Sequence, residues 1–103
     1  MKYRSRTDII SQILDMAYGG GGATKTKILY KACLSHNRLK EYLTVLTQSD
    51  LLIYDGQTHT FKTTEKGLQF LKTYNQIVHL IDAHEFGYGS DEDSRQPFLN
   101  YLS

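Results

Sequence analysis

The feature that most constrains the fold is a change of hydrophobic period in the middle of the chain. Apolar residues recur three and four positions apart over residues 35–48, which is typical of an amphipathic helix. Residues 51–54 and 60–63 are instead short runs of β-forming residues on either side of an Asp55-Gly56 turn signal. Helical spacing then resumes. The sequence therefore predicts a helix, a β-hairpin and another helix, in that order.

Two further helices are expected before this segment. Thr7 is predicted to cap the first, and the four consecutive glycines at residues 19–22 must end it because their backbone entropy opposes a helix. These glycines are interpreted as a connector, since the Gly-Lys-Ser/Thr ending of a phosphate-binding loop is missing. The second helix begins near residues 24–25 and breaks at residues 33–34, after which Ser35 caps the third.

This order of elements predicts a mostly α fold with a small β-hairpin (α+β), namely a winged helix-turn-helix with an extended C-terminal helix. Residues 1–73 are expected to form the domain, closed by Leu68 and Leu71. Residues 74–86 would extend the last helix to about Ala83, and residues 87–103 would form an acidic, flexible tail.

Charge is distributed unevenly between these parts. The chain has 103 residues and a net charge of +1, but residues 1–73 carry +5 and residues 74–103 carry −4. A basic surface attracts a phosphate backbone, so double-stranded DNA is the expected partner. No leader sequence and no apolar run of about 20 residues is visible, so we expect no membrane span and a cytoplasmic, nucleoid-associated protein.

The polar face of the third helix offers groups that recognise base pairs. Asn37 could pair with adenine and Arg38 with guanine or phosphate, although a merely solvated face would have the same composition. The start of the second helix, the hairpin and a basic N-terminal arm would contact phosphates. The predicted DNA-binding residues are Arg4, Arg6, Lys25, Thr26, Lys27, Ser35, His36, Asn37, Arg38, Lys40, Thr44, Gln57, His59 and Lys62.

Other chemistry has little support in the sequence. No nucleophile stands beside a base at a recognisable spacing, so we predict no enzyme activity, cofactor or small-molecule ligand. His79 and His84 with Glu85 are spaced poorly for a metal site on one helix face, and no metal is predicted. Cys33 is expected to be a small buried hydrophobe, with a redox-sensing role as the alternative.

The last helix carries an apolar stripe beyond the expected core. Tyr74, Ile77, Val78 and Ile81 have no evident partner in so small a domain, which favours a homodimer interface. The alternative is that the stripe folds back on the first helix. A two-fold dimer with both third helices on one face would reach successive major grooves, about 34 Å apart.

Four stretches, residues 4–10, 22–28, 39–43 and 62–68, resemble the archaeal ArnR-like winged-helix family. The chain is also similar to small dimeric archaeal chromatin proteins that join a winged helix to a C-terminal coiled coil. The resemblance implies a transcription regulator or nucleoid-associated protein, with residues 35–44 in the recognition helix. A protein-interaction module on the same scaffold is the alternative.

The chain departs from the resemblance where the third helix ends. Members often have glycine there, whereas this sequence has Ser49-Asp50. Aspartate adopts the left-handed backbone less easily than glycine, so we expect a local difference at this helix end.

Overall fold

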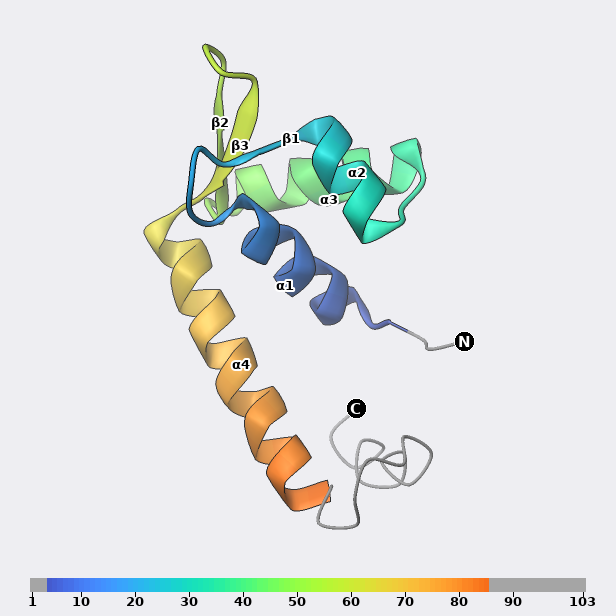
Figure 1. Cartoon of the computed structure of the whole chain (residues 1–103), viewed down its shortest axis with the longest axis vertical. Helices are drawn as coiled ribbons and strands as arrows, with labels where there is room; N and C mark the ends of the chain where they lie inside the picture. The colour runs from blue at the N-terminus through green and yellow to red at the C-terminus, as the bar shows by residue number, and fades with distance from the viewer. Residues whose placement is uncertain (1–3, 86–103) are drawn as a thin grey trace. The chain divides into compact units, whose positions relative to one another are not determined.

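A computed structural model describes residues 4–85, with side chains described for residues 4–81 (Figure 1). It confirms the predicted mostly α fold with a small β-hairpin and an extended last helix. The elements are α1 (Arg6–Ala17), β1 (Ala23–Thr24), α2 (Lys25–Ala32), α3 (His36–Gln48), β2 (Leu52–Asp55), β3 (Thr60–Thr63) and α4 (Glu65–Glu85). The predicted acidic tail at residues 87–103 lies outside the described residues.

The cap of α1 is Ser5, so the prediction of Thr7 is wrong. The Ser5 hydroxyl accepts a hydrogen bond from the amide of Asp8 at 3.1 Å, and the Asp8 carboxylate accepts one from the Ser5 amide at 3.0 Å. This reciprocal capping box satisfies two of the amides that a helix leaves free at its start. Helix α1 therefore begins at Arg6, and Thr7 lies within its first turn.

The sheet has three strands, whereas the sequence predicted only the hairpin. Strand β3 lies in the middle and pairs antiparallel with both β2 and β1. Gly22 precedes β1 with a φ of +88°, and a Cβ there would lie 2.6 Å from the carbonyl oxygen of Phe61. Glycine is thus required at this position for the connector to approach β3.

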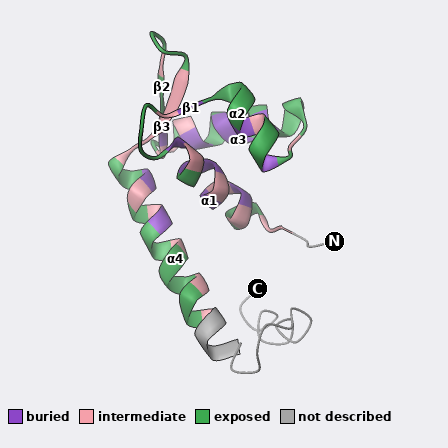
Figure 2. Ribbon diagram, viewed as in Figure 1, coloured by how far each residue is buried: buried purple, intermediate pink, exposed green. Residues whose placement is uncertain are grey.

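The core lies between α1, α2, α3 and the sheet. Its largest fully buried side chains are Ile13, Leu14, Ile28, Leu39 and Leu46. The hydroxyl of Thr63 donates a hydrogen bond to the carbonyl of Leu14 at 2.6 Å, which joins β3 to α1. Figure 2 shows the buried positions on the inward sides of α1, α2 and α3, as amphipathic helices require.

Helix α4 closes this core with its first two turns. Leu71 is buried, whereas Leu68 is half-buried. Thr64 caps α4, because its hydroxyl accepts a hydrogen bond from the amide of Gly67 at 3.0 Å and donates one to the carbonyl of Asp50 at 2.6 Å. The described part of the chain divides into two units after Leu71.

The turn between α2 and α3 places Cys33 at the surface, so the prediction of a buried thiol is wrong. Cys33 caps α2 in the left-handed conformation, with a φ of 55°. This backbone turns the Cys33 side chain outward, and the neighbouring Leu34 packs against the core instead. The predicted cap of α3, Ser35, is confirmed by the hydrogen bond that its hydroxyl accepts from the Arg38 amide at 3.2 Å.

Candidate nucleic-acid interface

The exposed residues of α3 cover a broad face of the helix, with Lys40 toward one edge and Arg38 at the other. Successive residues of an α-helix are rotated by about 100°, so Arg38 and Lys40 point about 160° apart. The sequence prediction had placed both on one outward face. The structure therefore divides the predicted reading helix into two surfaces with different neighbours.

The first surface is a polar stripe, which we call the reading stripe, formed by Asn37, Lys40, Thr44 and Gln48. These residues are three or four positions apart, and all four are exposed. Amide, ammonium and hydroxyl groups are the side-chain types that pair with base edges and phosphates. Gln48 was not predicted as a contact, although its position four residues after Thr44 places it in the same stripe.

The second surface contains Arg38, whose guanidinium is held by Tyr42. The guanidinium carbon lies 5.7 Å from the centre of the Tyr42 ring, and Nη2 is 3.4 Å from the Tyr42 hydroxyl. The ring itself is buried. Arg38 is thereby directed toward α1 and away from Lys40 of the reading stripe.

The start of α2 supplies a second group of exposed polar residues. Thr24 caps this helix, with its hydroxyl accepting a hydrogen bond from the Lys27 amide at 3.1 Å. Lys25, Thr26 and Lys27 are all exposed in the first turn. A helix start with lysines combines backbone amides with positive charge, which suits a phosphate.

The tip of the hairpin is ordered by the Asp55 carboxylate. One oxygen accepts a hydrogen bond from the Gln57 amide at 2.9 Å, and the other lies 3.3 Å from the ammonium of Lys62. The Gln57 amide, foremost, and the Lys62 side chain lower the pKa of Asp55. Lys62 was predicted to contact DNA, but its ammonium group already forms an ion pair with the Asp55 carboxylate.

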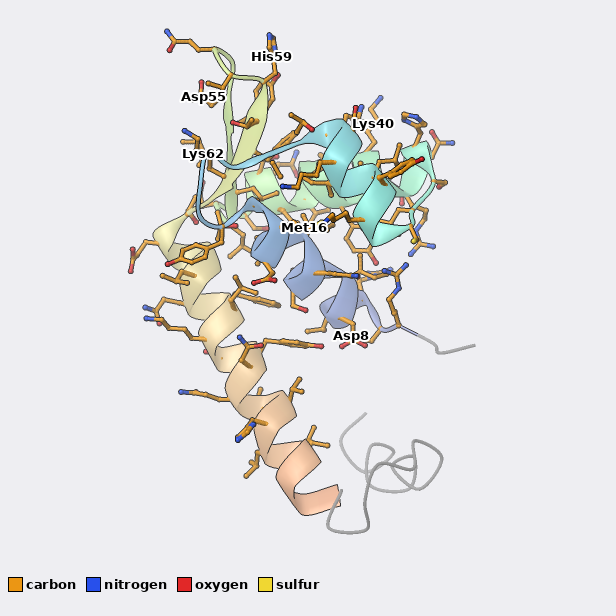
Figure 3. The ribbon with its side chains drawn as sticks, viewed as in Figure 1. Asp8, Met16, Lys40, Asp55, His59 and Lys62 are labelled. Carbon is orange, nitrogen blue, oxygen red and sulfur yellow. The ribbon has the colours of Figure 1, made fainter. Side chains whose placement is uncertain are left out.

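His59 is the exposed basic side chain at this tip. Its Nδ1 is 3.0 Å from the hydroxyl of Tyr54, whose ring packs against Phe61 with centroids 4.9 Å apart. Tyr54 was not predicted, and its position opposite Phe61 in the register explains its role. Figure 3 shows His59 and Lys40 toward the same side of the molecule.

The two N-terminal arginines do not form the predicted arm. Arg6 is the first residue of α1, and Arg4 donates a hydrogen bond from Nη1 to Oε1 of Gln12 at 2.7 Å. Both are therefore attached to α1.

Among the side chains of residues 4–81, no three of the types His, Cys, Asp and Glu lie close enough together to hold a metal ion. The side chains of His84 and Glu85 are not among those described. No helix within residues 4–85 has the length and apolar character needed to cross a bilayer.

A helix-turn-helix followed by a β-hairpin defines a class of small domains that place one helix in the major groove of DNA. The profile of the winged helix-turn-helix family matches residues 3–82, and the chain belongs to that family. Family membership supports a DNA-binding role. A search of curated proteins gives no significant match.

Proposed function

We propose that this protein binds double-stranded DNA as a transcription regulator or nucleoid-associated protein, without enzyme activity, and that α3 enters the major groove. The carrying observation is the reading stripe on α3, which lies beside an ordered wing. The major groove is about 12 Å wide and admits one helix. The archaeal ArnR-like resemblance supports a regulatory role.

The residues have different parts in this proposal. Asn37 suits adenine, because its side-chain NH2 can donate to N7 of the base while its carbonyl oxygen accepts from the N6 amino group. Lys40 and Thr44 contact bases or phosphates beside it, while Ser35 and His36 lie where α3 meets the groove wall. Lys25, Thr26 and Lys27 bind the DNA backbone through the charge of the two lysines and the partial positive charge of the helix start.

The wing contributes through its tip rather than through its strands. Gln57 and His59 are exposed there, so they can touch phosphate or the minor groove. Lys62 contributes less in this proposal, because releasing it for phosphate means breaking its contact with Asp55.

Mapping by nuclear magnetic resonance tests this interface. Titrating the ¹⁵N-labelled full chain with a duplex of mixed sequence should shift the amide signals of α3, the start of α2 and residues 56–59. A duplex that shifts no signals at low salt, or only signals of α4, would contradict the proposal.

We also propose that the protein is a homodimer joined through the second half of α4. Ile77 and Leu80 are 51% and 70% exposed, and Val78 and Ile81 are partly exposed nearby. The predicted interface residues Tyr74, Ile77, Val78 and Ile81 share one side of the helix, and Leu80 widens it. Pairing two identical stripes removes this apolar surface from water.

A further inference from the structure

The side of α3 next to the reading stripe, about 100° around the helix from it, borders a hollow of about 540 Å³. Helix α1 forms one wall and α3 the other. The lining residues are Arg6, Ile10, Arg38, Glu41, Tyr42 and Val45. A hollow of this size lies within the range of about 300–1,000 Å³ that is usual for small-molecule sites.

Two guanidinium groups face this hollow from different helices. Arg6 is in the first turn of α1 and Arg38 is in the first turn of α3. Among the described residues, neither forms an ion pair with a carboxylate, whereas Lys62 pairs with Asp55. Contact with Tyr42 restrains Arg38, so less side-chain entropy is lost when it binds an anion.

The rest of the lining is largely apolar. Ile10 is half-buried. Val45 is 53% exposed, although Leu46 beside it in the sequence is fully buried. Apolar walls with a few convergent polar groups are the usual composition of a ligand site. Glu41 is also among the lining residues, and its negative charge disfavours ligands with several anionic groups.

We propose that this hollow binds a small organic anion with one carboxylate or phosphate group and a compact apolar body. The anionic group lies between Arg6 and Arg38, and the apolar body lies against Ile10 and Val45. A DNA phosphodiester offers the same anionic chemistry. The apolar walls favour a free small molecule over the DNA backbone, which has no apolar body to place against Ile10 and Val45.

Phenyl phosphate, inorganic phosphate and benzyl alcohol are suitable probes, because they separate the charged part of the ligand from the apolar part. Each is titrated into the ¹⁵N-labelled full chain without DNA. Phenyl phosphate should shift signals of α1 and the first turns of α3, and it should bind at least about ten-fold more tightly than either of the other probes.

Arg38→Gln and Arg6→Gln remove the two charges separately, and Lys31→Gln is the matched control on α2. Each arginine variant should weaken phenyl phosphate binding about ten-fold, since a charge-assisted hydrogen bond is lost. The control should keep the affinity of the unmodified chain. Circular dichroism checks that each variant is folded. Because Arg6 and Arg38 are in different helices, the second variant still tests the site if the first does not fold.

Three results would overturn the proposal. Equal affinity for phenyl phosphate and inorganic phosphate would show that the apolar walls contribute nothing. Unchanged phenyl phosphate affinity in both arginine variants would place the site elsewhere. Absence of phenyl phosphate binding, together with equal losses of DNA affinity in Arg38→Gln and Lys40→Gln, would assign Arg38 to the DNA backbone. The binding assay without DNA separates this proposal from the DNA-binding proposal.

Discussion

Within residues 4–85, three non-glycine residues have a left-handed backbone, and each lies where the chain reverses or an element ends. Cys33 ends α2, Asp50 follows α3, and His59 precedes β3, with φ values of 55°, 63° and 57°. This conformation places Cβ near the following carbonyl oxygen and costs about 1–2 kcal/mol for most residues. The local structure around these three residues must offset that cost.

Asp50 gives a direct test of backbone strain. Asp50→Gly should be more stable than Asp50→Ala by about 1 kcal/mol, because glycine adopts positive φ freely and alanine does not. The comparison isolates the backbone, since the bond from Thr64 goes to the Asp50 carbonyl, which both variants keep. Urea unfolding measures the difference. Equal free energies of unfolding would mean that this residue is not strained.

Residue spacing contained more information about α3 than the sequence interpretation used. Asn37, Lys40 and Thr44 follow one helical side, whereas Arg38 and Val45 follow another through Tyr42. The two sides could have been separated from the sequence alone. The hollow could not, because it depends on where α1 packs against α3.

Among the elements, the hairpin has at its tip a carboxylate that both backbone amides and a lysine contact. Asp55 accepts hydrogen bonds from the Gln57 amide at 2.9 Å and the Thr58 amide at 3.4 Å. Its pKa is lowered, first by the Gln57 amide and then by Lys62. A carboxyl whose pKa is lower in the folded state stabilises that state when ionised.

The wing tip should therefore loosen in acid. The stabilisation is present above the pKa of an unfolded aspartate, about 3.9, and is lost as pH falls through the lower pKa of the folded state. The amide signal of Gln57 should report this change below the usual aspartate range. In Asp55→Asn the pH dependence should disappear. A Gln57 signal that titrates at the ordinary aspartate pKa would contradict the assignment.

Close packing at the start of α4 gives a second test at this scale. A Cβ on Gly67 would lie 2.6 Å from Cγ2 of Thr63 and would also meet the carbonyl oxygen of Leu51. Gly67→Ala should therefore destabilise the protein by about 1–3 kcal/mol through overpacking. Gly21→Ala is the control, because nothing lies within 4 Å of that Cβ. Thermal unfolding that ranks the two variants equally would refute the close approach.

The long elements were predictable because their signals are local. Periodicity, Ser35 and Thr64 determine α3, the hairpin and α4 within one or two residues. Strand β1 has only two residues and forms by pairing with β3, so its sequence carries no period to detect. The capping of α1 was mistaken because Ser5 and Thr7 are both capping residues, and only Ser5 has Asp8 three positions later.

For the whole molecule, oligomeric state decides how many reading stripes meet the DNA. Isolated apolar residues are common on surfaces. Ile77, Leu80 and Ile81 are instead three or four positions apart on α4, so they form one continuous apolar patch. A dimer would present two copies of α3, and its affinity for DNA would exceed that of one domain.

Placing a charge in the apolar stripe of α4 tests the dimer. Ile77→Glu should change the mass of the species in solution from two chains to one, because an unpaired carboxylate in an apolar interface is costly. Gln76→Glu adds the same charge at an exposed neighbouring position and should leave the dimer intact. Sedimentation velocity measures both variants. A monomeric unmodified chain at micromolar concentration would exclude this interface.

The most direct test of the central claim is duplex DNA affinity measured as a function of salt for three proteins. These are the unmodified chain, Lys40→Ala in the reading stripe, and Lys31→Ala on α2 outside it. Affinity should fall steeply with salt, and Lys40→Ala should weaken binding and reduce the slope of log K against log salt by about 1, while Lys31→Ala changes little. No binding by the unmodified chain at low salt, or equal losses in both variants, would contradict the account.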